Sequence, residues 1–169
     1  MKDPLIVYFE HYLPFTTEEK TLIKSKFTEH IVKRRENILQ EGIICHYYSC
    51  IVKGCFRMYG VADDGTEHNI QFAAENDWIM DIGSFHTQKR SQLNIKALEP
   101  SVILKVEQQD LYLLYRSIPK LDRIFKVIIE NKYVELQNHV LQNISSTAQK
   151  RYVNFLEQYP RLSSRLPSA

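Results

Sequence analysis

The sequence has few of the residues on which specialised sites depend. Its five glycines are spread along 169 residues, so no glycine-rich loop is available to cradle the phosphates of a nucleotide. Its three cysteines are odd in number and recur every five residues, which fits neither C-x2-C zinc pairs nor a disulfide framework. We therefore expect Cys45, Cys50 and Cys55 to be reduced and mostly buried.

Long apolar runs and a strong net charge are also absent. No run approaches the roughly 18 to 20 apolar residues of a membrane-spanning helix, and the N-terminal stretch lacks the h-region and cleavage site of a signal peptide. We therefore expect a cytoplasmic protein without membrane contact. The net charge of +2 is too small for a protein that coats nucleic acid. Hydrophobic residues make up 44% of the chain, which is the composition of an ordinary globular domain with a core.

The pattern of the chain changes near Pro119, and the part before it is mostly strand-like. Residues 5–12 can form a short helix, and Thr16 with Glu19 matches a capping box that predicts a second helix from residue 17 to about 27. Eight short apolar runs follow, with turn residues between them, and Asp64-Gly65 indicates a hairpin. This pattern predicts an α+β, mainly β, domain built as an antiparallel sandwich or roll. The runs are 30–34, 38–40, 45–52, 55–61, 68–72, 78–81, 93–98 and 102–106.

The part after Pro119 is helical to the end. A short helix over 110–115 should end near it, and a long helix should then run over about 121–144. From residue 129 the apolar positions recur at steps of four, three and four, as in a coiled-coil seam: Ile129, Tyr133, Leu136 and Val140. Such a seam needs a second helix, most simply its own copy in a homodimer; the alternative is packing on the chain's own β-domain.

The last part of the chain predicts one more helix. Ser145, Ser146 and Thr147 break the long helix, and the hydroxyl of Thr147 can cap a further helix over 148–158.

Several short motifs occur in a fixed order that resembles the sensor half of the Crp/Fnr family of bacterial transcription regulators. Each motif is weak alone, whereas their order and spacing together are specific. They are Gln40-Glu41-Gly42, the strand pair from Tyr47 to Gly54, the hairpin Asp64-Gly65-Thr66-Glu67, the turn Asn76-Asp77-Trp78-Ile79, Ile95-Lys96-Ala97-Leu98-Glu99, and the run from Leu104 to Leu111.

The resemblance implies a fold and partners. The fold would be a double-stranded β-helix, a jelly-roll-like barrel, with N-terminal helices over residues 1–118, followed by a long C-terminal dimerisation helix over 119–145. Residues 146–169 would be the hinge and first helix of a winged helix-turn-helix domain that is otherwise missing. The implied partners are a second copy of the chain, DNA through the missing domain, and a small-molecule effector.

The resemblance also locates an effector pocket in the segment 80–92, which we call the cassette. In relatives that bind cyclic nucleotides, the cassette reads G-E-L and later R-S/T-A, and the acid and arginine bind the ribose and the cyclic phosphate. Here Met80 replaces the glycine and Asp81 the longer acid. An ungapped register places Ser91-Gln92-Leu93 at the second triplet and removes the arginine, whereas one deletion in the loop restores Arg90-Ser91-Gln92. The candidate residues are Met80, Asp81, Ile82, Gly83, Arg90, Ser91 and Gln92.

These observations leave several functions open. The favoured hypothesis is an effector-sensing, dimerising domain that is degenerate for cyclic AMP; the alternatives are a true cyclic nucleotide sensor and a dimerising interaction module without a ligand. A cupin-type enzyme is disfavoured because the histidines occur singly rather than in metal-binding pairs: His11, His30, His46, His68, His86 and His139. We predict no catalytic residue, no metal ligand and no cofactor. The one cofactor considered is a cyclic nucleotide.

Overall fold

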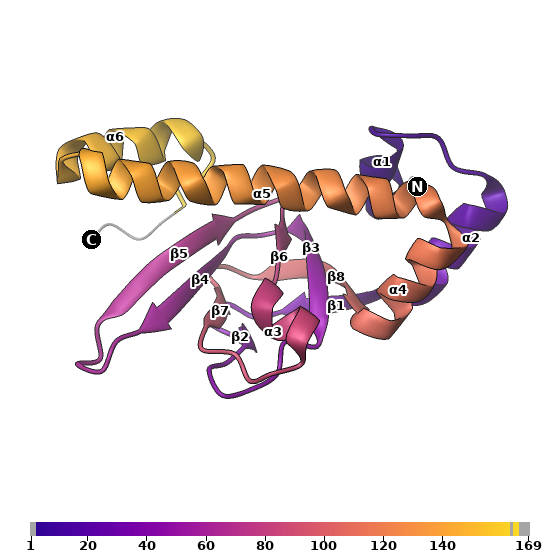
Figure 1. Cartoon of the computed structure of the whole chain (residues 1–169), viewed down its shortest axis with the longest axis horizontal. Helices are drawn as coiled ribbons and strands as arrows, with labels where there is room; N and C mark the ends of the chain where they lie inside the picture. Colours follow the sequence, from indigo (N-terminus) through magenta and orange to yellow (C-terminus); the bar gives the residue numbers. More distant parts are fainter. Residues whose placement is uncertain (1–2, 163, 166–169) are drawn as a thin grey trace. The chain divides into compact units, whose positions relative to one another are not determined.

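The computed structural model describes residues 3–162 and 164–165 (Figure 1). By its internal contacts the chain divides into two compact units, Met1–Pro119 and Lys120–Ala169, which are described separately. The first unit holds all the strands and the cassette, and the second holds nearly all of the long helix and the final helix.

Two short helices begin the first unit. Helix α1 spans Pro4–Glu10, where the carboxylate of Asp3 accepts hydrogen bonds from the first turn. Helix α2 spans Thr17–Lys26 and begins with the predicted capping box, in which Thr16 N–H donates to Glu19 Oε2 at 2.8 Å and Glu19 N–H to Thr16 Oγ1 at 3.2 Å. The first helix ends two residues earlier than predicted and the second about one residue earlier.

The strands form two four-stranded antiparallel sheets, in the orders β1-β8-β3-β6 and β2-β7-β4-β5. This eight-stranded roll is the predicted jelly-roll-like architecture (Figure 1). Each predicted apolar run overlaps one strand, with ends that differ by one or two residues in most cases. The strands are β1 Thr28–Val32, β2 Asn37–Leu39, β3 Tyr47–Lys53, β4 Phe56–Val61, β5 Glu67–Ala73, β6 Trp78–Ile79, β7 Asn94–Ala97 and β8 Ser101–Glu107.

The C-terminal end of the run predicted over 78–81 was wrong, and this error affects the candidate site. Strand β6 stops at Ile79, and Asp81 is instead the N-cap of helix α3, Ile82–Thr87. An aspartate next to free backbone N–H groups is stabilised more as a helix cap than as a strand residue.

Glycine residues shape two of the turns that connect the strands of the roll. The predicted hairpin joins β4 to β5, with Gly65 at a φ of +86° and the N–H of Ala62 donating to the carbonyl of Thr66 at 2.9 Å. Between β3 and β4, Gly54 has a φ of +108°, and a Cβ there would lie 2.0 Å from Ser101 Oγ. Gly54 is therefore required both by its backbone conformation and by the close approach of β8.

Trp78 is the centre of an aromatic cluster in the core of the first unit. Its ring centroid lies 5.0 Å from that of Tyr48 and 5.9 Å from that of Phe9 in α1. Phe27 also contacts it, edge to face, and Tyr48 in turn lies 6.0 Å from Phe85 of α3. The only tryptophan thus joins α1 to the sheet that contains β3 and β6, and α3 reaches the same cluster.

The first unit ends with α4, Gln108–Ser117, which is longer at both ends than the predicted helix over 110–115. Helix α5 then spans Pro119–Ser145 and helix α6 Ala148–Gln158, with the predicted cap from Thr147 Oγ1 to the N–H of Lys150 at 3.3 Å. The buried residues of α5 all lie in its first half: Leu121, Ile124, Phe125 and Ile128.

Within the second unit α6 lies beside the end of α5, where His139 Nε2 and Gln158 Oε1 are 3.0 Å apart. Among the described residues, no helix is long and apolar enough to cross a membrane.

Candidate effector site

Helix α3 forms the first part of the cassette, and Asp81 begins it. Asp81 Oδ1 accepts hydrogen bonds from the N–H groups of Gly83 at 3.1 Å and Ser84 at 3.3 Å. The N–H of Phe85 donates to the backbone carbonyl of Asp81 at 2.9 Å. The N–H groups that a short helix could offer to an anion are therefore largely satisfied from within the chain.

The other carboxylate oxygen of Asp81 is bound by Ser91, from the far end of the cassette. Ser91 Oγ donates to Asp81 Oδ2 at 2.6 Å and accepts the N–H of Leu93 at 3.0 Å. Ser91 is 3% exposed, and its backbone also bonds to Ile43 and Gly42. The buried Ser91 hydroxyl is thus hydrogen-bonded to the carboxylate of Asp81, which, by resemblance, would bind a ribose hydroxyl.

The remaining candidate residues of the cassette do not converge on one site. Met80 is buried, at 7% exposure, and Gly83 and Gln92 are exposed. Arg90 is also exposed, and its backbone pairs with Ile44 in an isolated β-bridge. Ile82 is 46% exposed. The structure therefore brings Asp81 and Ser91 together and leaves the Arg90 side chain on the surface.

Ser84 is a residue of the cassette that the sequence analysis missed. Its hydroxyl donates to the carbonyl of Lys89 at 2.5 Å and accepts the backbone N–H of Cys45 at 2.9 Å. It thereby ties α3 to the segment that leads into β3. A serine inside a short helix gives no periodic signal, so nothing in the sequence distinguished it from a surface residue.

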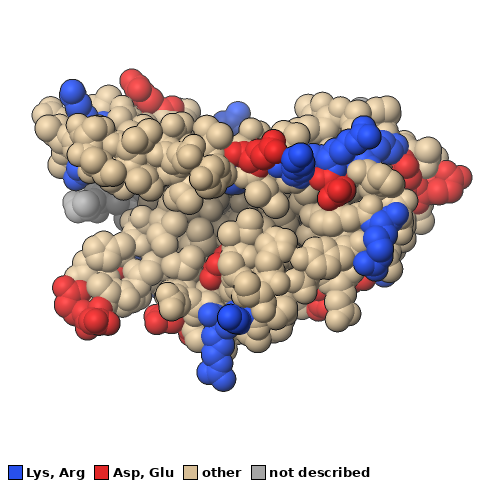
Figure 2. Space-filling model, in the orientation of Figure 1, with Lys and Arg blue, Asp and Glu red and all other residues tan. Residues whose placement is uncertain are grey.

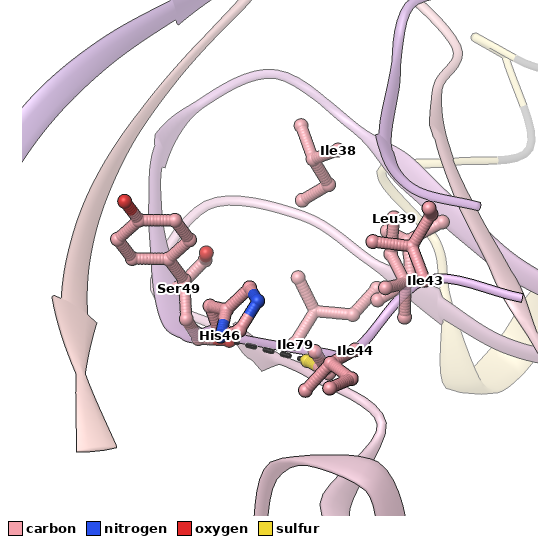
Figure 3. Close-up of a pocket in the computed structure, with 10 residues that line it drawn as sticks. Ile38, Leu39, Ile43, Ile44, His46, Ser49 and Ile79 are labelled. Carbon is pink, nitrogen blue, oxygen red and sulfur yellow. Dashed lines mark hydrogen bonds between the residues drawn. The ribbon is translucent and has the colours of Figure 1, made fainter. Parts of the chain in front are cut away.

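A cavity of about 180 Å³ lies in the roll beside the cassette (Figure 3). Most of its wall is aliphatic, and the polar side chains face it from β3 and the segment before it. The lining residues are Ile38, Leu39, Ile43, Ile44, Cys45, His46, Tyr47, Ser49, Ile79 and Ile95. None of them was predicted as a site residue, because they come from four strands and one loop that are distant in sequence.

Burial raises the pKa values of two groups that line this cavity. It raises the pKa of the Cys45 thiol to about 11, and Cys45 Sγ contacts the carbonyl of Tyr47 at 3.4 Å. The pKa of Tyr47 is also raised, by burial and by a hydrogen bond with Glu107. Both groups, which are mainly neutral at physiological pH even at their ordinary pKa values, are thus harder to ionise.

Within the described part of the chain, the metal-binding side chains do not gather into a further site. Among residues 3–162 and 164–165, no three His, Cys, Asp or Glu side chains are grouped so that they could hold a metal ion. On the face that Figure 2 shows, lysine and arginine side chains stand in separate groups, and several of these groups adjoin Asp or Glu side chains.

The fold and the cassette together define an antiparallel β-roll, with a capped short helix inserted between β6 and β7. Comparison with family models identifies it further, because the model described as "Cyclic nucleotide-binding domain" matches residues 29–117, more than half of the chain. The chain belongs to the cyclic nucleotide-binding domain family. Comparison with curated protein sequences finds no significant match.

Solved structures share the fold at low sequence identity. A protein described as a transcriptional regulator of the Crp/Fnr family from Eubacterium rectale aligns with a TM-score of 0.75 at 15% identity, over 93% of this chain and 73% of its own. FixK2 from Bradyrhizobium japonicum aligns with a TM-score of 0.70 at 22% identity, over 85% and 69%. The Catabolite Activator Protein of Thermus thermophilus gives 0.65 at 16% identity, over 79% and 61%.

The resemblance predicted from the motifs is thus confirmed for the domain family and the fold. The chain spans only 61% of the Thermus protein, so these identities support a shared architecture and do not by themselves transfer an activity.

Proposed function

We propose that the chain is the effector-sensing and dimerising domain of a Crp/Fnr-type transcription regulator, and that its cassette is degenerate for cyclic nucleotides. The effector state of the roll would alter the pair of long helices and so the position of two DNA-binding domains, one from each chain. DNA would be contacted through a domain beyond the described residues, as the Crp/Fnr resemblance implies. Such coupling requires two states with different contacts at the effector site.

The bond between Ser91 and Asp81 is the observation that carries the degeneracy. A ribose hydroxyl would have to displace the Ser91 hydroxyl from Asp81 Oδ2, to which it is bonded at 2.6 Å. The phosphate would find the N–H groups of Gly83 and Ser84 already bonded to Asp81 Oδ1. Each replacement breaks an existing hydrogen bond to a charged group, which contributes about 1.5–3 kcal/mol.

Calorimetric titration with cyclic AMP and cyclic GMP tests this part of the proposal. We expect no saturable heat at millimolar nucleotide. Saturable heat that disappears in an Asp81→Ala variant would instead identify a true cyclic nucleotide sensor. The Asp81→Ala control is needed because nonspecific binding of a nucleotide would not depend on that carboxylate.

The second half of α5 supports the proposed dimer. The seam residues Tyr133, Leu136 and Val140 are 61%, 49% and 50% exposed, and Ile129 is half-buried. Exposed Ile144 continues the same row, and exposed Val134 and Leu141 flank it. A row of exposed apolar side chains along one helix face is costly in water and is stabilised by pairing with an equivalent face.

Substitution of the seam tests the dimer. We expect Leu136→Asp to convert a dimer into a monomer, as measured by light scattering, because it places a charge in the centre of an apolar interface. Asn138→Asp adds the same charge on the opposite face of α5 and should leave the dimer intact. A wild-type monomer, or a Leu136→Asp variant with the mass of a dimer, would contradict the assignment of the seam.

A further inference from the structure

The cavity in the roll contains a polar group for which the described part of the chain provides no partner. Ser49 lies on β3, is 3% exposed and lines the cavity, and no hydrogen bond to its hydroxyl is found among the described residues. Figure 3 shows Ser49 and His46 on one side of the cavity and the isoleucine side chains around the rest. Buried hydroxyls are nearly always hydrogen-bonded, so an unpaired one that faces a cavity is suited to a ligand.

We propose that this cavity binds a small, uncharged, mainly apolar molecule about the size of one aromatic ring, with a single hydrogen-bonding group that pairs with Ser49. The inference rests on the proposed sensing function and specifies the chemistry of its effector.

The volume of the cavity limits the size of the ligand. Its 180 Å³ is smaller than the roughly 300–1,000 Å³ of sites that hold drug-sized ligands. It is close to the roughly 150 Å³ of an engineered apolar cavity that binds benzene. A molecule of one ring fits this space, whereas a cyclic nucleotide would need the cassette to open.

The surrounding charges favour an uncharged ligand. Lys105 lies opposite Ser49 on the neighbouring strand β8, and its Nζ is 4.0 Å from the centre of the Tyr47 ring. Glu107 lies opposite Tyr47 on the same strand. One cation and one anion thus flank the polar side of the cavity, and the remaining wall is aliphatic. A charged ligand would lose its hydration, and the two opposite charges beside the cavity would offset each other's attraction for it.

The cavity is also connected to the cassette. Cys45 lines the cavity, and its backbone N–H donates to Ser84 Oγ in α3 at 2.9 Å. Ile79 lines it too and stands two residues before Asp81. A ligand that shifts the loop before β3 therefore acts directly on α3.

The test compares phenol with toluene, which differ in one hydroxyl, by calorimetry on the full chain. We expect both to bind in the millimolar range or tighter. Ser49→Ala should weaken phenol binding about fivefold, the equivalent of one neutral hydrogen bond, and leave toluene binding within about twofold. If Ser49→Ala weakens both molecules equally, or neither, the assigned role of its hydroxyl is wrong.

Filling the cavity tests its location. Ile95→Phe should abolish binding of both molecules, and the half-buried lining residue Ile44 offers a second filling variant, Ile44→Phe, if the first does not fold as judged by circular dichroism. Ile70→Phe, on the exposed face of β5, is the control and should bind as the wild type does. Absence of binding in the wild type at saturating probe, or unchanged binding in a folded filled variant, would overturn the proposal.

The outcome is separable from that of the dimer experiment. A protein that is dimeric through Leu136 but binds neither probe retains the proposed function and loses this ligand class. A monomeric protein that binds phenol through Ser49 retains the site and loses the dimerising function.

Discussion

Removing the hydroxyl of Ser91 should destabilise the fold by an amount that its geometry sets. The hydroxyl donates to a carboxylate at 2.6 Å and accepts the N–H of Leu93 at 3.0 Å, in a side chain that is almost fully buried. A hydrogen bond to a charged group contributes about 1.5–3 kcal/mol. Water can reach half-buried Asp81 in the variant, so the lower part of that range applies. We expect Ser91→Ala to lower the free energy of unfolding by about 2 kcal/mol.

A double-mutant cycle isolates the bond itself. Asp81→Ala should lose the same bond plus the cap of α3, and caps contribute about 1 kcal/mol. In the double variant the bond is lost only once, so urea unfolding should give a coupling energy of about 1.5–2 kcal/mol with unchanged m values. Thr87→Ala removes an exposed hydroxyl from the same helix and should change stability by no more than about 0.5 kcal/mol. A coupling energy below about 0.5 kcal/mol would refute the view that Ser91 holds Asp81.

Further predictions concern the turn at Gly54 and the buried thiols. Gly54→Ala should lower the free energy of unfolding by at least about 2 kcal/mol, because the new Cβ would meet Ser101 and φ is positive; Gly65→Ala, with a positive φ in open space, should lower it by only about 1 kcal/mol in the same urea experiment. Burial raises the pKa of Cys45 to about 11 and of Cys50 to about 12 from 9.0, so the folded state holds these protons more tightly than the unfolded state. The contribution of these protonated thiols to the stability of the fold is complete below pH 9 and is lost as pH rises toward 11 and 12. Unfolding curves at increasing pH should therefore show falling stability, with a smaller fall in Cys50→Ala; a flat profile above pH 9 would contradict the burial effect.

The sequence was sufficient to predict the fold because its local signals agree with one another. Thr16 and Glu19 specify the start of a helix by reciprocal bonds, and Asp64-Gly65 specifies a hairpin by a positive φ, so each is decided within a few residues. The end of β6 was mispredicted because Asp81 prefers the N–H groups of the next helix, which exist only when that helix forms. Strand ends next to a capping residue are decided by the neighbouring element.

The candidate site was harder to predict because its contacts join distant parts of the chain. The choice between Arg90 and Ser91 depends on how the chain leaves α3, whose C-cap Gln88 has a left-handed φ of +55°. No periodic pattern passes through such a loop, so the sequence left both registers open. The role of Ser49 was equally hard to predict. The alternation of inward and outward side chains can place a serine on the inner face of β3, but it does not show whether β2, β6 and β7 leave a cavity beside that serine.

The two parts of the site differ in what a ligand could add to them. In the cassette, Asp81, Ser84 and Ser91 already bond to one another or to the backbone, so a ligand must break about as many hydrogen bonds as it makes. In the cavity, the hydroxyl of Ser49 lines an aliphatic space, and a ligand there would gain a hydrogen bond and bury apolar surface without first disrupting the chain. Under the proposed function, the free energy for sensing is therefore available in the cavity, and the bond from Cys45 to Ser84 links the cavity to α3.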